Sequence, residues 1–304
     1  MYAPIKRPYP PQNAGKSCQR GPGKFFATSR ARVATGIRCC QRMIRIAAHV
    51  SSGLCTVSLQ FPRYGQTQRD QRINRWSYRL TEMLGLHVKV CGAPPKSRQR
   101  TLILANHISW VDIFALNAVS TARFVAKSEV GSWPLIGRLC KGTGTLFIER
   151  ENKRDTARLN HEIVAALEAD QNIAVFPEGT SSDGTSLRPF RSSLLQPAIA
   201  CQTIIQPVYL RYVDANGSLS RTAAYCDDIS FGTSMWNLLA GKDITVELHY
   251  LEPISATSSD DRRKLTSSIE ARIRAKQLEL SPAMMHTHPT PAPEISRHHP
   301  AEPQ

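Results

Sequence analysis

Strand-like and helix-like segments alternate between residues 85 and 280, and this alternation limits the chain to few folds. Short apolar runs are typical of strands, and amphipathic runs between them are typical of helices. The expected strands are 87–91, 101–105, 123–126, 146–148, 173–176, 204–212 and 244–251. The expected helices are 110–119, 132–140, 152–169 and 260–280. This order predicts an α/β fold with a largely parallel central sheet flanked by helices.

The net charge of +15 is concentrated near the amino terminus. Residues 1–79 contain fifteen Lys and Arg residues and a single acid, Asp70, so the remaining chain is close to neutral. A basic segment of this kind is attracted to an anionic bilayer or to a nucleic acid. The sequence contains no helix-turn-helix, zinc-finger or aromatic RNA-binding motif. We therefore expect an anionic membrane surface as a partner, and we expect no nucleic acid.

Composition divides the chain into four parts. Residues 1–42 are predicted to form a basic disordered arm, because their first half is rich in Pro, Gly, Lys and Arg. Residues 43–84 are predicted to form a membrane-associated helical segment. Residues 85–280 hold the alternating pattern and form the α/β domain. Residues 281–304 are rich in Pro and His and are predicted to form a disordered tail.

The helical segment has two halves with different character. Residues 43–61 are moderately apolar, but polar residues interrupt them, and a spanning helix needs about 20 predominantly apolar residues. A helix that lies in the membrane interface is favoured, with a packed helix and a true span as alternatives. Residues 69–84 carry apolar side chains at helical spacing, so they predict an amphipathic helix that ends at Gly85.

Cysteine usage indicates a reducing compartment. None of the eight cysteines forms a C-x-x-C pair, and the sequence has no signal-peptide pattern. The expected location is therefore the cytoplasmic face of a membrane. The chain also lacks metal-ligand spacing and a glycine loop of the dinucleotide or phosphate-binding type, so no metal and no cofactor are predicted.

A histidine and an aspartate follow the apolar strand 101–105 in the segment Asn106-His107-Ile108-Ser109-Trp110-Val111-Asp112. A histidine with an acid to orient it can deprotonate a hydroxyl for attack on an activated acyl group. Ser109 and Asp112 also fit a helix cap, with Ser109 as N-cap and Asp112 in the first turn. Residues five apart do not face each other on one helix, so His107 must precede the helix and fold back toward it.

Two further blocks follow at strand ends. Gly144-Thr145-Leu146-Phe147-Ile148-Glu149-Arg150 runs through a strand to an arginine, whose planar fork can grip two phosphate oxygens. Phe176-Pro177-Glu178-Gly179-Thr180 follows a buried strand. Without further context, the first block could be an ordinary strand end and the second an ordinary Pro-Glu-Gly turn.

Taken in this order, the three blocks resemble the glycerolipid acyltransferases typified by 1-acylglycerol-3-phosphate acyltransferase. The resemblance covers about residues 43–255. It implies the glycerolipid acyltransferase fold, with residues 85–280 as the acyltransferase domain. It also implies that His107 is the general base and that Asp112 orients it. The residues that it assigns to acceptor binding are Gly144, Arg150, Glu178, Gly179 and Thr180.

The resemblance implies a substrate pair as well. The donor is acyl-CoA or acyl-carrier protein, and the acceptor is a lysolipid whose hydroxyl is itself the nucleophile. The favoured acceptor is 1-acylglycerol-3-phosphate, which gives phosphatidic acid in phospholipid biosynthesis at the cytoplasmic face of the inner membrane. Members that form phosphatidic acid commonly carry an arginine directly after Glu-Gly-Thr, where this chain has Ser181. This departure leaves lyso-ornithine lipid as an alternative acceptor.

Two alternatives lie outside this class. One is a catalytically inactive basic protein that binds membrane or nucleic acid, although His107, Asp112, Arg150 and Glu178 are all present. The other is a serine hydrolase, although the chain has no G-x-S-x-G elbow.

Overall fold

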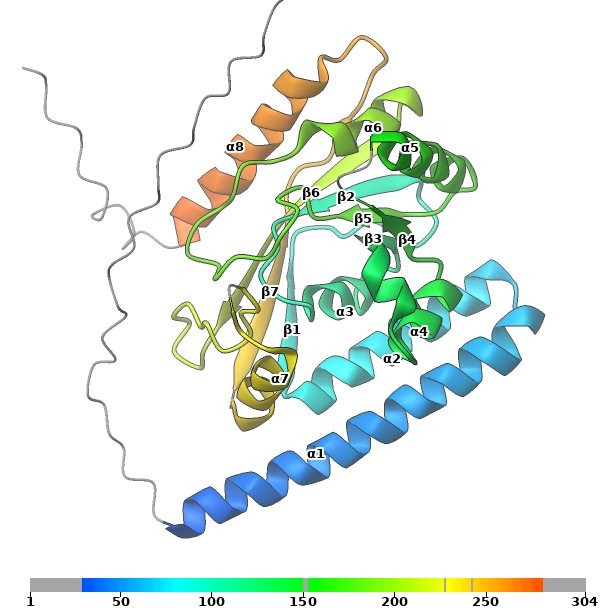
Figure 1. Cartoon of the computed structure of the whole chain (residues 1–304). Helices are drawn as coiled ribbons and strands as arrows, with labels where there is room; N and C mark the ends of the chain where they lie inside the picture. The colour runs from blue at the N-terminus through cyan, green and yellow to red at the C-terminus, as the bar shows by residue number, and fades with distance from the viewer. Residues whose placement is uncertain (1–28, 150–152, 227, 242, 281–304) are drawn as a thin grey trace, which may run out of the picture.

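The computed structural model describes residues 29–149, 153–226, 228–241 and 243–280. In this part of the chain, an eight-stranded sheet forms the middle layer, with the strand order β1-β7-β6-β2-β5-β3-β4 and with β8 beside β6 (Figure 1). The strands are β1 (Leu86–Cys91), β2 (Thr101–Ala105), β3 (Arg123–Lys127), β4 (Leu146–Ile148), β5 (Ile173–Val175), β6 (Ile204–Val213), β7 (Ile244–Tyr250) and β8 (Ile254–Ser255).

Most neighbouring strands are parallel, as the sequence predicts. Strands β6, β2, β5, β3 and β4 run in one direction. Strand β7 is antiparallel to β6, and β1 is parallel to β7. The amino-terminal ends of β1 and β7 therefore lie at the same edge of the sheet as the carboxyl-terminal ends of β2, β5 and β6.

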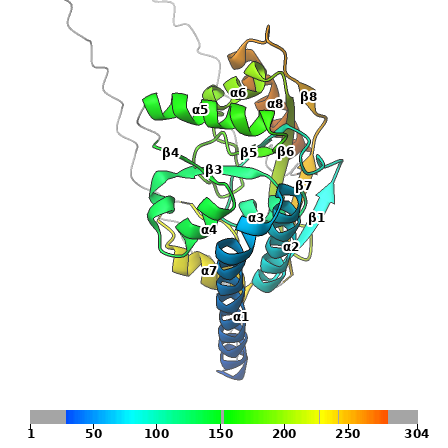
Figure 2. The same ribbon diagram turned by 90° about the vertical axis from the view of Figure 1, so that its right-hand side faces the viewer.

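Helices cover both faces of the sheet, which makes a three-layer α/β/α arrangement (Figure 2). One layer contains α1 (Ser29–Cys55), α2 (Gln66–Leu84), α3 (Asp112–Asn117), α4 (Ile136–Gly142) and α7 (Phe231–Ala240). The other layer contains α5 (Lys153–Glu168), α6 (Gln196–Ala200) and α8 (Arg262–Leu280). Short 3-10 and π turns complete the chain: η1 (Thr56–Gln60), η2 (Phe61–Arg63), η3 (Ser128–Ser132) and η4 (Ser192–Leu195).

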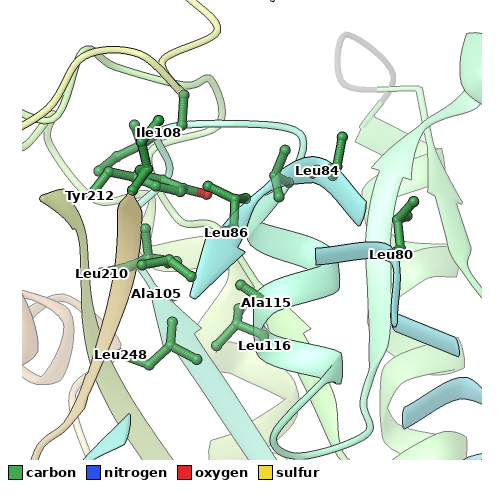
Figure 3. Close-up of a cluster of buried hydrophobic side chains, with 14 of the residues drawn as sticks. Leu80, Leu84, Leu86, Ala105, Ile108, Ala115, Leu116, Leu210, Tyr212 and Leu248 are labelled. Atoms are coloured by element: carbon green, nitrogen blue, oxygen red, sulfur yellow. The ribbon is translucent and has the colours of Figure 1, made fainter. Parts of the chain in front are cut away.

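Strand β2 shows how the sheet separates two hydrophobic cores. Ile103 and Ala105 join the core beneath α2, α3 and α7, which Figure 3 shows in close-up. Leu102 and Leu104 join the core beneath α5, α6 and α8. A strand that is buried on both faces reads as a continuous apolar run, which is why 101–105 is visible in the sequence.

The amino-terminal helices differ from the expectation at one boundary. Helix α2 ends at Gly85, as predicted, and Gly85 has a φ of +80°, a conformation that glycine adopts without strain. Helix α1, however, begins at Ser29, so the prediction of a disordered arm through residue 42 is wrong for residues 29–42. Tertiary contacts order this stretch, since Cys39 is buried and Arg42 donates a hydrogen bond to the Leu239 carbonyl of α7 (3.0 Å).

Two of the predicted parts concern the ends of the chain. The arm before residue 29 and the predicted tail 281–304 lie outside the described residues. Across the described helices, none has both the length and the apolar character needed to cross a membrane.

A buried glutamate joins three strands on the face of the sheet opposite to Leu210 and Tyr212. Glu247 of β7 forms ion pairs with Lys89 of β1 (2.9 Å) and with Arg211 of β6 (2.7 Å), and it accepts a hydrogen bond from Nε2 of His249 (3.1 Å). Burial alone would raise the pKa of Glu247, but hydrogen bonds from these three side chains lower it to about 2. A carboxylate with a lowered pKa stabilises the fold wherever it is ionised.

Replacement of Glu247 by glutamine is expected to lower the free energy of unfolding by roughly 2–3 kcal/mol at neutral pH, since each pKa unit corresponds to about 1.4 kcal/mol. The stabilisation is fully present above about pH 4.5 and is lost as the pH falls toward 2. Urea unfolding at a series of pH values measures the difference. Glu252→Gln, at an exposed position after β7, is the matched control. A difference that stayed constant down to pH 2 would contradict this account.

Candidate active site

Three loops meet where strands β2, β5 and β6 end. The loop after β2 connects to the other two through its backbone: the carbonyl of His107 accepts the N–H of Ser182 (2.8 Å), and the carbonyl of Ile108 accepts the N–H of Tyr225 (2.9 Å). Parallel strands bring their carboxyl-terminal loops to one edge, and functional side chains commonly gather there. The structure therefore places the two blocks that contain His107 and Glu178 beside each other.

His107 and Asp112 face each other across the start of helix α3. The Nδ1 atom of His107 lies 2.9 Å from Oδ2 of Asp112. His107 precedes the helix, so the chain folds back as the five-residue spacing requires. The His107 ring stacks on Phe176, with ring centroids 4.0 Å apart and planes 13° apart. The ring is therefore held both at its edge and on one face, while 20% of the side chain stays exposed.

The Asp112 carboxylate is completely buried and receives four hydrogen bonds. Oδ2 accepts the Nδ1–H of His107 and the backbone N–H groups of Ile108 (2.7 Å) and Ser109 (2.9 Å). Oδ1 accepts the hydroxyl of Tyr212 (2.7 Å). These four donors occupy both oxygens of the buried carboxylate and fix its orientation. Asp112 can therefore fix the proton of His107 on Nδ1 and leave Nε2 as the proton acceptor.

The helix cap differs from the prediction. Ser109 was the expected N-cap, but α3 begins at Asp112 and its N-cap residue is Val111. The Ser109 hydroxyl instead accepts the N–H of Val111 (3.4 Å). The Asp112 side chain reaches back from the helix and accepts the N–H groups of Ile108 and Ser109 in the preceding loop. Asp112 does lie in the first helical turn, as predicted.

Asn106 anchors the start of the loop. Its side-chain amide donates to the carbonyl of Leu210 (2.9 Å) and accepts the N–H of Leu210 (2.7 Å). The pairing of β2 with β6 ends at Ala105 and Val208, so the Asn106 side chain continues the ladder where the backbone leaves the sheet. The position of His107 is thus set by the sheet.

Glu178 supports His107 from the neighbouring loop. The carboxylate is 5% exposed. Oε1 accepts the backbone N–H of His107 (2.8 Å), and Oε2 accepts the backbone N–H of Arg188 (3.0 Å). Burial raises the pKa of Glu178, and the backbone hydrogen bonds from Arg188 and His107 oppose that rise. This geometry favours a positioning role for Glu178 over the predicted direct contact with the acceptor.

The other residues of that block lie beside an arginine. Gly179 has a φ of +75°, and a Cβ at this position would lie 2.9 Å from Nε of Arg191. The absence of a side chain therefore lets the Arg191 guanidinium lie against the backbone. Thr180 is exposed. The Ser181 hydroxyl donates to the carbonyl of Tyr225, so Ser181 connects the loop after β5 to the loop after β6.

The structure does not bring Gly144 to this site. Gly144 precedes β4, and its carbonyl accepts a hydrogen bond from Nε of Arg123 at the start of β3 (2.5 Å). These strand beginnings lie at the edge of the sheet opposite His107. With a φ of +79°, Gly144 makes room for the Arg123 guanidinium, which a Cβ would meet at 2.7 Å. Arg150 lies outside the described residues.

Sequence reasoning missed Tyr212, whose hydroxyl contacts Asp112 from 100 positions further along the chain. The available signal was strand periodicity. In β6, alternate residues point to the same face, so Val208, Leu210 and Tyr212 share the core that contains Ala105 and Ile108. Within the described residues, no three His, Cys, Asp or Glu side chains gather closely enough to hold a metal ion.

Comparisons with known proteins define the class. Residues 87–211 match the protein family described as Acyltransferase. The chain is 37% identical to a 1-acyl-sn-glycerol-3-phosphate acyltransferase of Neisseria gonorrhoeae over 193 residues, which cover 63% of this chain and 74% of that protein. It is 34% identical to a lyso-ornithine lipid O-acyltransferase of Pseudomonas aeruginosa over 244 residues, 78% of this chain and 93% of that protein.

The fold agrees with a solved structure. A crystal structure of the 1-acyl-sn-glycerophosphate acyltransferase PlsC from Thermotoga maritima superposes with a TM-score of 0.61 at 20% identity, covering 82% of this chain and 97% of that one. The α/β fold and the sequence matches thus define an acyltransferase of lipid metabolism. The chain belongs to the PlsC-like family of 1-acylglycerol-3-phosphate acyltransferases, as its three sequence blocks predicted.

Proposed function

We propose that the chain transfers a fatty acyl group from acyl-CoA or acyl-carrier protein to the free hydroxyl of 1-acylglycerol-3-phosphate, forming phosphatidic acid. The observation that carries the proposal is the 2.9 Å contact between Nδ1 of His107 and the buried Asp112 carboxylate. This pair presents Nε2 as a base beside an edge of the sheet where three loops meet. The chemical role follows from general acid–base catalysis.

The proposed reaction needs no covalent enzyme intermediate. Nε2 of His107 takes the proton of the acceptor hydroxyl as the oxygen attacks the carbonyl carbon of the thioester. The C–S bond then breaks, and the departing thiolate takes the proton from the imidazolium. Asp112 stabilises the imidazolium between the two steps and does not itself take the proton. Glu178 holds the backbone of His107 in place.

Lyso-ornithine lipid is the second candidate acceptor. Ser181 stands where members that form phosphatidic acid commonly carry an arginine, and its hydroxyl donates a hydrogen bond to the Tyr225 carbonyl. The matching protein of Pseudomonas aeruginosa is described as a lyso-ornithine lipid O-acyltransferase. Arg191, whose guanidinium lies against Gly179, is a cation beside this turn and supports a phosphate-bearing acceptor. We favour 1-acylglycerol-3-phosphate on this ground.

The test follows thiol release from an acyl-CoA and from an acyl-carrier-protein thioester. Lysophosphatidic acid and lyso-ornithine lipid are offered in parallel as acceptors. Release that depends on lysophosphatidic acid and is lost in His107→Ala supports the proposal. Release only with lyso-ornithine lipid supports the second candidate. No acceptor-dependent release with either donor, together with salt-sensitive binding of nucleic acid, would support the inactive basic protein.

We further propose that the chain works on an anionic membrane surface, at the cytoplasmic face of the inner membrane. Helix α1 leaves Ile37, Met43 and Ile44 exposed, with Ile44 70% accessible. Arg45 is exposed beside them. Apolar side chains with neighbouring cations favour binding in the membrane interface.

Vesicles that contain phosphatidylglycerol are expected to bind the full chain more tightly than phosphatidylcholine vesicles, and added salt is expected to weaken the binding. Ile44→Glu is expected to weaken co-sedimentation with the anionic vesicles. The matched control is Leu278→Glu, because Leu278 is also exposed but lies on α8 in the other helical layer. Equal losses in the two variants would count against docking through α1.

A further inference from the structure

Strand β6 contains two fully buried tyrosines, and within the described residues only one of their hydroxyls has a hydrogen-bond partner. Tyr209 and Tyr212 are 1% and 0% exposed. The Tyr209 hydroxyl has no hydrogen-bond partner within the described residues. The Tyr212 hydroxyl donates to Oδ1 of Asp112 at 2.7 Å. Burying a phenol hydroxyl is costly without a partner, so the chain gains from this hydrogen bond at position 212.

The Tyr212 ring is held rigidly enough to aim its hydroxyl. It belongs to the same buried cluster as Leu86, Ile108 and Leu210 (Figure 3). Burial and the adjacent Asp112 carboxylate raise the pKa of Tyr212 well above its usual value. The hydroxyl therefore stays protonated and can only donate to the carboxylate.

The two oxygens of Asp112 are held from different parts of the fold. Oδ2 is bound by the loop after β2, through His107, Ile108 and Ser109. Oδ1 is bound by the sheet, through Tyr212. The terminal torsion χ2 of an aspartate has a broad energy profile, so hydrogen bonds to Oδ2 alone allow the carboxylate to rotate about this torsion. A donor on Oδ1 fixes the plane of the carboxylate.

We propose that Tyr212 is a positioning residue for the acyl transfer, which acts through Asp112 to hold the Nδ1–H tautomer and the orientation of His107. Tyr212 also draws part of the carboxylate charge toward Oδ1 and away from the imidazole. The inference rests on the proposed function, because it assigns Tyr212 to the same His–Asp pair. It does not depend on which acceptor is used.

The charged and titratable groups around His107 set the expected pH effect. Asp112 faces the ring from α3, Glu178 faces its backbone from the loop after β5, and Tyr212 acts from β6. Removing the Tyr212 hydroxyl concentrates negative charge on Oδ2, which favours the protonated imidazole. The acidic limb of the kcat/KM profile is then expected to move to higher pH.

The experiment compares Tyr212→Phe with Tyr209→Phe in the full chain, using acceptor-dependent thiol release. Tyr212→Phe is expected to lower kcat about 10-fold or more, because hydrogen bonds to charged groups are among the strong ones. KM for the acceptor is expected to stay within about twofold, because an interaction made through Asp112 acts on the transition state. Tyr209→Phe is expected to keep wild-type kcat and the wild-type pH profile.

A second replacement keeps the test open if Tyr212→Phe fails to fold. Incorporating 3,5-difluorotyrosine at position 212 preserves the ring and makes the hydroxyl a stronger donor. The acidic limb is then expected to move to lower pH, opposite to Tyr212→Phe. If the wild-type chain shows no release that depends on His107, the proposed function fails. If the wild type is active but Tyr212→Phe matches Tyr209→Phe in kcat and in pH profile, only the role of Tyr212 is overturned.

Discussion

Replacement of His107 by alanine is expected to reduce acceptor-dependent thiol release about 1,000-fold or more, near the middle of the range for a general base. The loss follows because the variant has no group at this position that can take the acceptor proton. The side chain is partly exposed and stacks on one ring, Phe176, so the fold is expected to survive. Steady-state kcat and KM, with a thermal unfolding curve, separate loss of chemistry from loss of structure.

The matched control is His161→Ala, at an exposed position on α5 in the other helical layer. This variant is expected to keep wild-type rates. If His107→Ala retained more than about a tenth of the wild-type kcat while remaining folded, another group would have to supply the base, since a tenfold change corresponds to only about 1.4 kcal/mol.

Asp112→Asn is expected to lower kcat about 100- to 10,000-fold, as found where the acid partner of a catalytic histidine loses its charge. The amide can turn so that its oxygen accepts from the loop and its NH₂ donates to the Tyr212 hydroxyl oxygen. The Tyr212 hydroxyl hydrogen then loses the buried acceptor that it has in Asp112, so a stability cost of about 1–3 kcal/mol is expected. The catalytic loss comes from the missing negative charge beside the imidazolium.

The double variant tests whether the two residues act as one unit. His107→Ala combined with Asp112→Asn is expected to lose little more activity than His107→Ala alone, because residues that act together are strongly non-additive. Measured kcat/KM values for the four proteins complete the cycle. Additive losses would show that Asp112 contributes to the reaction independently of His107.

The local part of the site could be predicted from the sequence. Strand β2 is an uninterrupted apolar run because both its faces are buried, and His107 follows directly after it. The fold-back of His107 toward Asp112 followed from the helical repeat. The end of α2 at Gly85 followed from the conformational freedom of glycine. Each of these features depends on a few neighbouring residues.

The remaining features depend on contacts between distant parts of the chain. The order in residues 29–42 comes from packing on α7, and α7 itself was not predicted. The downstream block showed that a glutamate was present, but only the tertiary structure shows that Glu178 holds the His107 backbone. The contact of Tyr212 with Asp112 spans 100 residues and has no local signature. Helix packing decides the first of these contacts and the order of the strands decides the other two, and the sequence pattern reveals neither.

The hydrogen bonds made by Asn106 restrict the length of the loop after β2. Asn106 forms hydrogen bonds with the backbone of Leu210 on β6, and Asp112 accepts a hydrogen bond from Tyr212, two positions further along the same strand. Both ends of the segment 106–112 are therefore bonded to β6, and the spacing of Leu210 and Tyr212 on that strand fixes the length of the segment. A residue inserted or deleted between Asn106 and Asp112, or between Leu210 and Tyr212, would break one of these two contacts. The loops after β5 and β6 are longer, so they have more room to differ in sequence between enzymes with different acceptors.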